Sequence, residues 1–394
     1  MGVIDLPMFL AIVSAVLGAT VGSFLNVVIY RIPLGLSVNE PRRSFCPSCK
    51  YKIPLHLNIP IISWFLLGGK CKNCSARVSF RYCFVELLTS VLFLTAWLTF
   101  AGSFDSAFYN KNHGNPQVVL VSWALISLLV CASFIDIEHQ IIPDRINKIG
   151  IIVAVACAFI FPEIVYEFMG MENSSYDGVY SRISAVCWSL AGMGCGFVIL
   201  YSVVIFGKIL FGKKSLCSEA GTSWSVIEGK ENPILIVGDV KMPFEDLFFV
   251  GTEKIVLDSS EIEINGKCHG EGELVIYYDK LVVSDDVEIP IEDWKTLEGV
   301  SSQIIYRREA MGLGDVKFIA MFGAFIGWKG VLFALFAASI IGTSANLPAK
   351  ILGKDSAFTR IPFGPYLAIG AMIWLFFGAE LIEWYFNLLT IDTL

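Results

Sequence analysis

Long apolar segments alternate with polar connections along most of the chain. A membrane span needs about 20 predominantly apolar residues, and about eight segments approach that length. The sixth and seventh are short and share a break at residues 327–330. One long kinked segment is the alternative, but we interpret the break as the turn of a tight helical hairpin. The pattern therefore predicts an α-helical polytopic membrane protein with about eight transmembrane helices. They cover roughly residues 7–29, 83–101, 117–135, 146–162, 183–206, 316–328, 330–347 and 365–387.

Residues 213–310 follow a different pattern, in which short runs of β-branched residues are separated by turn residues. The run from Ile234 to Val237 and the turn pair Asn265 and Gly266 are typical of short antiparallel strands joined by hairpins. Residues 213–309 also carry 20 acidic and 10 basic side chains, whereas the rest of the chain carries 16 and 19. We therefore predict an acidic all-β domain, inserted into a slightly basic membrane protein and not part of its chemistry.

The composition agrees with a membrane protein. Hydrophobic residues make up 55% of the chain and charged residues only 16%, against roughly 25% charged residues in an average soluble domain. The mean hydropathy is +0.66. These values exclude a secreted disulfide scaffold and a disordered chain. With a net charge of −7, the chain also lacks the basic character of a typical nucleic-acid binder, so we expect the lipid bilayer as a partner and no nucleic acid.

Lysine and arginine residues are concentrated in alternate connections between the apolar segments. Segment 30–82 and the connections around Arg145 and Lys350 are basic, whereas connection 163–180 has acidic residues and no basic one. Because basic connections stay in the cytoplasm, we expect both termini on the outer side. The expected divisions are a first transmembrane helix at 1–29, a cytoplasmic segment at 30–82, transmembrane helices at 83–212, the inserted cytoplasmic domain at 213–310 and the last transmembrane helices at 311–394.

Segment 30–82 contains two C-x-x-C pairs, Cys46 with Cys49 and Cys71 with Cys74. Two such pairs about twenty residues apart match the spacing of a zinc ribbon. Four thiolates would complete the tetrahedral shell of one zinc ion and leave no open position, which predicts a structural site. The alternatives are two disulfides or four unrelated thiols, and disulfides rarely persist on the reducing cytoplasmic side.

Two acidic residues lie at predicted membrane borders on the cytoplasmic side. Asp136 ends the third apolar segment, and Asp315 opens the sixth after Gly312 and Gly314, which would allow close backbone approach. An ionisable group at such a border is costly and indicates a function. Two facing carboxylates that share a proton form an acid/base pair. The alternatives are that Asp315 caps the sixth helix and that Asp136 is an ordinary juxtamembrane acid.

Glu138 and Asp144 compete with these two residues for a catalytic role. Asp144 follows Pro143 and precedes a predicted helix, so helix capping would explain it, whereas Glu138 has no such explanation and no glycine-rich setting.

Two other classes of protein are alternatives to an enzyme with a catalytic pair of aspartates. A transporter would place acids in its spans but would more often show inverted repeats, and a non-catalytic assembly subunit would tolerate the loss of either aspartate.

Five stretches of the chain resemble the type IV prepilin leader peptidases, membrane aspartic proteases of the Gly-x-Gly-Asp kind. They occur in the same order as in that family and cover nearly all of the predicted membrane part. The stretches are 22–33, the two C-x-x-C pairs with residues 69–71 between them, 81–82 with 86–89, 136–144, and 308–317.

The resemblance implies cleavage of the basic leader from prepilins and pseudopilins at the cytoplasmic face of the bacterial inner membrane, before pilus or type II secretion assembly. Asp136 and Asp315 would then be the catalytic pair, with Gly312, Gly314, Lys317, Glu138 and Asp144 as supporting residues. Many members also methylate the new N-terminus with S-adenosylmethionine. That activity is plausible here because all four cysteines are present, although the sequence offers no recognisable site for the methyl donor. The insert before Gly312 departs from the family pattern.

Overall fold

The structure is a computed structural model in two compact units, each of which is described by itself. The first unit comprises Met1–Tyr201, Leu313–Ala349 and Ile361–Leu394, and the second comprises Ser202–Gly312 and Lys350–Arg360. The described residues are 6–41, 44–101, 116–168, 178–211, 214–227, 233–237, 240–244, 255–277, 280–283, 287–290, 297–306, 312–351 and 362–391.

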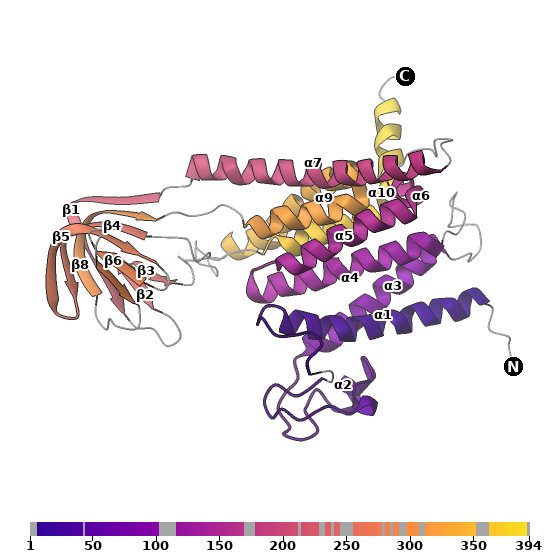
Figure 1. Ribbon diagram of the computed structural model, residues 1–394, viewed down its shortest axis with the longest axis horizontal. Coiled ribbons are helices and arrows are strands. Elements are labelled where there is room, and N and C mark those ends of the chain that lie inside the picture. Colours follow the sequence, from indigo (N-terminus) through magenta and orange to yellow (C-terminus); the bar gives the residue numbers. More distant parts are fainter. Residues whose placement is uncertain are drawn as a thin grey trace. The chain divides into compact units, whose positions relative to one another are not determined.

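The first unit is a bundle of long apolar helices (Figure 1). Within the described residues, five helices are long and apolar enough to cross a membrane: Met8–Arg31, Phe80–Phe100, Gln117–His139, Val179–Gly207 and Leu313–Leu347. A shorter apolar helix covers Gly364–Gly378. The helices as assigned are α1 (Leu6–Arg31), α2 (Ile62–Leu66), α3 (Phe80–Phe100), α4 (Pro116–His139), α5 (Asp144–Ile160), α6 (Pro162–Phe168), α7 (Val179–Phe211), α9 (Leu313–Ile351) and α10 (Gly364–Ile391).

Helix α9 is interrupted where the sequence predicts the hairpin. Gly327 has φ 72° and ψ 178°, which is not helical. A Cβ added to Gly323 would lie 2.7 Å from Cγ2 of Val331, although an unbroken helix would separate these residues by about 12 Å along its axis. The two parts of α9 therefore turn back on each other, and the sixth and seventh apolar segments are two helical pieces.

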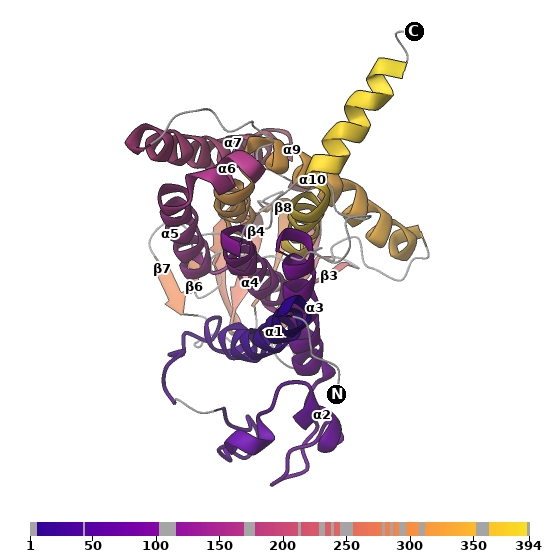
Figure 2. The ribbon, with the colours of Figure 1, turned by 90° about the vertical axis from the view of Figure 1, so that its right-hand side faces the viewer.

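Helices α1 and α3 pack with their backbones in close contact. A Cβ added to Gly18 would lie 2.8 Å from Cα of Ser90, and a Cβ added to Gly22 would lie 2.7 Å from Cα of Glu86. Two small residues four positions apart allow this approach, as in other membrane helix pairs. The hydroxyl of Ser90 also donates to the carbonyl oxygen of Ala15 at 2.8 Å. This packing fixes the C-terminal half of α1 against the first half of α3; Figure 2 shows α1 and α3 from a second direction.

The second unit contains an eight-stranded antiparallel sheet in the order β3-β2-β1-β8-β4-β5-β6-β7. The β-rich character predicted for this part of the chain is therefore confirmed. The strands are β1 (Lys214–Ile227), β2 (Ile234–Val237), β3 (Val240–Pro243), β4 (Ile255–Ile264), β5 (Lys267–Ile276), β6 (Lys280–Val283), β7 (Val287–Pro290) and β8 (Leu297–Tyr306). The predicted boundaries at 212–213 and 310–311 fall outside the described residues.

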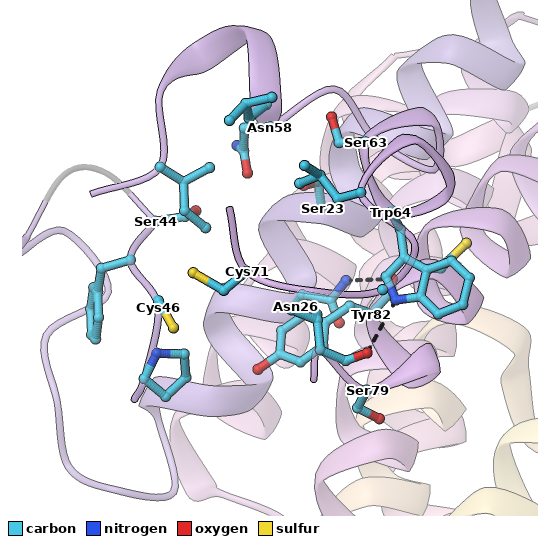
Figure 3. Close-up of a pocket in the computed structure, with 18 of the residues that line it drawn as sticks. Ser23, Asn26, Ser44, Cys46, Asn58, Ser63, Trp64, Cys71, Ser79 and Tyr82 are labelled. Carbon is cyan, nitrogen blue, oxygen red and sulfur yellow. Dashed lines mark hydrogen bonds between the residues drawn. The ribbon is translucent and has the colours of Figure 1, made fainter. Parts of the chain in front are cut away.

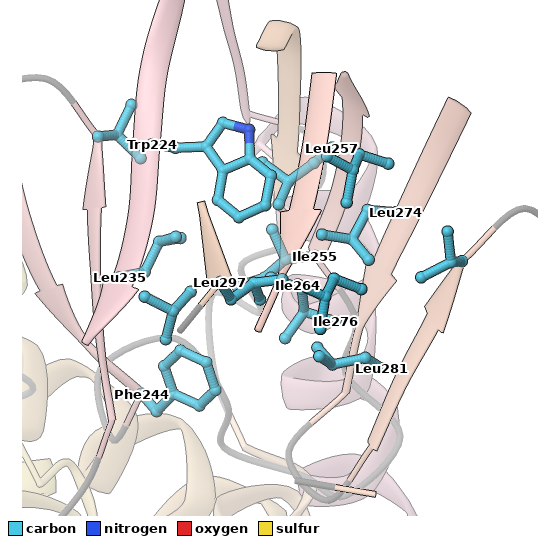
Figure 4. Close-up of a cluster of buried hydrophobic side chains, with 14 residues drawn as sticks. Trp224, Leu235, Phe244, Ile255, Leu257, Ile264, Leu274, Ile276, Leu281 and Leu297 are labelled. Carbon is cyan, nitrogen blue, oxygen red and sulfur yellow. The ribbon is translucent and has the colours of Figure 1, made fainter. Parts of the chain in front are cut away.

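The hairpin between β4 and β5 forms at the predicted turn. Asn265 and Gly266 have φ 52° and 76°, and Ile264 pairs with Lys267 across them, as in a two-residue turn with positive φ at both positions. A bulge between Ser259 and Ile262 shifts the alternation, so that Ile255 and Leu257 face the core before it and Ile262 after it. Figure 4 shows the resulting core, with Trp224, Phe244 and the branched side chains of the central strands.

Candidate active site

Asp136 lies in the last turn of α4 and is only 5% exposed. Its Oδ2 accepts a hydrogen bond of 3.0 Å from the backbone N–H of Gly364, the first residue of α10. The N-terminus of a helix has backbone N–H groups without a helical partner and favours a negative charge. The carboxylate is therefore held by backbone rather than by a flexible side chain.

Position 364 has room only for glycine. A Cβ added there would lie 2.7 Å from Oδ2 of Asp136 and 3.0 Å from Cδ1 of Ile142. We expect Gly364→Ala to displace the carboxylate and lower the rate of any reaction that depends on it by about 10- to 100-fold, because small misplacements of reacting groups have effects of that size. The control is Gly194→Ala, since a Cβ there would meet nothing within 4 Å. Equal rates for Gly364→Ala and the wild type would contradict the steric argument.

Asp315 is partly buried in the first turn of α9. The preceding Gly314 packs on the segment between α4 and α5, where an added Cβ would lie 3.4 Å from Cβ of Ile142. Ile142 is therefore the common neighbour of the helix ends that carry Gly364 and Gly314. The helix begins at Leu313, so Asp315 lies inside the first turn and is not its N-cap.

The two competing acids are engaged in ion pairs with other helices. Nζ of Lys317 donates hydrogen bonds to Oδ1 and Oδ2 of Asp144 at 2.7 and 2.9 Å, which links α5 to α9. The N-cap of α5 is Pro143 with no side-chain bond, so the capping role considered for Asp144 is wrong. Glu138 pairs with Nη1 of Arg81 from α3. These pairs are partly exposed and contribute little to stability, but they join helices around Asp136.

The four cysteines of segment 30–82 come together in space. All are free thiols, and their sulfur atoms lie within 4.8 Å of one another. The Sγ atoms of Cys46 and Cys74 are 3.8 Å apart, and those of Cys49 and Cys71 are 4.0 Å apart. A tetrahedral zinc ion with Zn–S bonds of about 2.3 Å requires sulfur atoms about 3.8 Å apart. The donor set therefore fits one such ion, and the disulfide alternative is wrong.

Each cysteine pair sits on the same type of turn. The N–H of Cys46 donates to Tyr51 and that of Cys71 donates to Ala76, both at about 3 Å. The residue after each pair has positive φ, at 57° for Lys50 and 56° for Ser75. Such paired turns present the two thiols of each pair on one side, which explains why the predicted spacing brings all four together.

Backbone N–H groups favour thiolates at two of the cysteines. The N–H of Tyr51 and the side chain of Asn73 lower the pKa of Cys49 to about 6, and the N–H groups of Cys74 and Asn73 lower the pKa of Cys71. The N–H of Ala76 also favours a thiolate at Cys74. Nevertheless, the neighbouring thiols of Cys49 and Cys71 and burial raise the pKa of Cys74 to about 12. A cation among the four sulfurs would favour the thiolate form of all four cysteines.

Two sequence profiles match the chain. That of the bacterial peptidase A24 N-terminal domain covers residues 16–100, with the four cysteines, and that of the type IV leader peptidase family covers residues 281–347, with Asp315. The chain belongs to the type IV leader peptidase family. Asp136 lies between the two matched ranges, and residues 308–311 of the last motif fall outside the described residues.

Relatives named prepilin leader peptidase/N-methyltransferase match this chain, and two of the three described here match it along most of its length. The protein of Aeromonas hydrophila is 24% identical over 93% of this chain and 90% of its own length. That of Legionella pneumophila is 26% identical over 97% and 96%. The protein of Myxococcus xanthus is 40% identical, over 39% of this chain and 41% of its own length. No solved structure matches the chain.

Sequence reasoning missed two partners of the candidate residues in this leader peptidase. Gly364 had a local signal, because it stands directly before Pro365 at a predicted helix start, but nothing in the sequence connects it with Asp136. Arg81 was noted only as part of a motif, and its pairing with Glu138 joins residues 57 positions apart. Such contacts depend on how helices pack, which a single sequence does not specify.

Proposed function

We propose that this chain is a prepilin leader peptidase, a membrane aspartic endopeptidase that removes the basic leader from type IV prepilins and pseudopilins. The observation that supports it best is the buried carboxylate of Asp136, held by the N–H of Gly364. The helix end bearing Asp315 packs on the same neighbour, Ile142. The names of the full-length relatives agree. A non-catalytic assembly subunit would have no need for a carboxylate held in this way.

In the proposed reaction, Asp136 and Asp315 act as a pair that shares one proton. The ionised carboxylate takes a proton from water as the water attacks the scissile carbonyl carbon. The protonated carboxyl donates its proton to the leaving amine. Gly312 and Gly314 allow the substrate backbone to approach Asp315, and the ion pairs of Lys317 with Asp144 and of Glu138 with Arg81 support the helices that carry the pair.

The proposed setting is the bacterial inner membrane, crossed about eight times, with both termini outside and the aspartates at the cytoplasmic face. The break in α9 and the apolar α10 supply helical pieces beyond the five long helices. A prepilin consists of a basic leader followed by an apolar helix, so its scissile bond would lie at the membrane border. Water also reaches a border site more easily than the bilayer centre.

Two further parts of the proposal concern the cysteine segment. The four thiols hold a structural zinc ion, which their distances fit. The enzyme also methylates the new N-terminus of the cleaved substrate with S-adenosylmethionine, in line with the names of the relatives.

Mass spectrometry of a co-expressed prepilin tests the proposal. With the wild-type chain, the prepilin should lose its leader and gain the mass of one methyl group. With Asp315→Ala, it should keep its full length. A prepilin that stays uncut by the wild-type chain in its native membrane, or that is cut equally by the variant, would overturn the proposed peptidase function.

The inserted sheet is not part of the proposed chemistry. Its first and last strands run side by side, and Lys214 lies opposite Tyr306 in the pair β1–β8. Paired residues in an antiparallel sheet are about 5 Å apart, so a short flexible linker can replace residues 220–302 without separating the flanking helices. We expect this deletion to retain cleavage of a purified prepilin within about tenfold of the wild-type rate, because loop replacement leaves the aspartates unchanged. A deletion protein that inserts and binds zinc but does not cut would contradict this expectation.

A further inference from the structure

A cavity of about 500 Å³ lies between the end of α1, the cysteine segment and the start of α3 (Figure 3). Tyr30, Trp64 and Tyr82 contribute aromatic rings to its wall, beside polar side chains such as Asn26. Its volume falls within the range of about 300–1,000 Å³ that is typical of small-molecule sites. The reaction proposed for the two aspartates makes no use of this cavity.

Two polar atoms of the lining are buried without a partner among the described residues. Asn26 is 4% exposed, and its Nδ2 donates to the carbonyl oxygen of Tyr82 at 2.9 Å, but its Oδ1 accepts no hydrogen bond from them. Nε of Arg81 likewise has no acceptor there, although Nη1 of the same guanidinium pairs with Glu138. Buried polar atoms are almost always hydrogen-bonded. The two atoms therefore indicate a ligand that offers both a donor and an acceptor.

A carboxylate is also held in place in the wall. Oε2 of Glu86 accepts the N–H of Ile61 at 2.7 Å, and the hydroxyl of Ser23 bonds the same carboxylate. Ile61 has φ 65°, a conformation that is unfavourable for a β-branched residue and that marks functional sites more often than ordinary loops. A fixed carboxylate in a concave, largely apolar wall favours a ligand that carries a positive charge.

We propose that this cavity binds the sulfonium methyl donor, S-adenosylmethionine, with Asn26, Arg81 and Glu86 as its polar binding residues. This inference rests on the methyltransferase part of the proposed function. S-adenosylmethionine has a purine ring that can stack on the aromatic wall and amino groups that can donate a hydrogen bond to Asn26. Its carboxylate can accept a hydrogen bond from Arg81, and the negative charge of Glu86 favours its positively charged sulfur.

The position of the cavity fits the order of the two reactions. Glu138 lines it and lies two residues after Asp136 on α4, in the same last turn of the helix but on a different face. The amino group released by cleavage loses a proton to water and attacks the methyl carbon with its lone pair. The new N–C bond forms as the C–S bond breaks, its electron pair returns to sulfur, and a neutral thioether leaves.

Calorimetric titration of the full-length chain in detergent with S-adenosylmethionine and with S-adenosylhomocysteine, its neutral product, tests the assignment. Glu86→Gln keeps an oxygen for the N–H of Ile61 and removes only the charge. It should weaken donor binding about tenfold or more and product binding less. Asn26→Leu should weaken both ligands, and Glu163→Gln, an exposed acid on α6, should change neither. Donor affinity that is unchanged in both cavity variants would overturn the assignment.

Photochemical cross-linking of labelled donor to the wild-type chain gives a readout that does not depend on how the variants fold. The label should appear in peptides that contain Tyr30, Trp64 or Tyr82, and label confined to other helices would overturn the assignment. Prepilin cleavage is measured on the same preparations. Cleavage without donor binding overturns the assignment and leaves the peptidase intact, whereas donor binding without cleavage overturns the peptidase and supports the cavity. Variants that raise only the KM for prepilin would instead identify a leader-binding site.

Discussion

Asp136→Asn and Asp315→Asn should each abolish prepilin cleavage, with a loss of about 10³-fold or more. A pair that shares one proton needs both members, so neither residue can replace the other. General acid–base groups typically contribute 10²- to 10⁴-fold to a rate. The amide in Asp136→Asn still offers an oxygen to the N–H of Gly364, so the helix ends should remain in place and only the acid–base function should be lost.

Single-turnover cleavage of a purified prepilin is the measurement, and zinc content and thermal unfolding report whether each variant is folded. Glu163→Gln is the control, because Glu163 is an exposed acid on α6 with no part in the proposed reaction, and this variant should cleave at the wild-type rate. Substantial cleavage by either aspartate variant would contradict the shared-proton pair and direct attention to Glu138 or Asp144.

Replacement of any one of the four cysteines by serine should release the metal from the chain. Purified wild-type protein should contain about one zinc ion per chain, and the variants about none, because a structural site relies on all four thiolates. We also expect the cysteine segment to become sensitive to protease, since metal binding to such small segments provides much of their folding free energy.

Metal analysis by mass spectrometry and limited proteolysis are the measurements. Cys131→Ser is the matched control, because Cys131 is buried in α4 away from the cluster, and it should keep its zinc. Cleavage should fall only partly in the cluster variants, since the aspartates belong to other helices. A metal-free wild-type protein with full activity would contradict the structural zinc site.

The sequence predicted well those features that depend on neighbouring residues. The spacing within and between the C-x-x-C pairs predicted the cluster, because each pair sets its own turn. The Asn265–Gly266 turn and the break at Gly327 were also predictable, since both require conformations that few other residues adopt. In the same way, the length of the apolar runs predicted the long helices.

Other features depend on packing between distant helices and were not predictable. The N–H that holds Asp136 comes from residue 364, and the cation paired with Asp144 comes from residue 317. The cavity beside the cysteine segment is lined jointly by α1, by the cysteine segment and by α3, which come together only through helix packing. None of these contacts leaves a local pattern, so the capping role considered for Asp144 was wrong and the role of Gly364 was missed.

The central place of β8 has a consequence for how the chain is made. β8 is the last strand of the sheet in the sequence, yet it pairs with both β1 and β4 and joins the two halves of the sheet. Until the ribosome has released residue 306, β1 and β4 each keep an unpaired edge, which is prone to pairing with other chains. Synthesis then continues directly into α9, so the segment that carries Asp315 emerges only after the last strand of the sheet has been made.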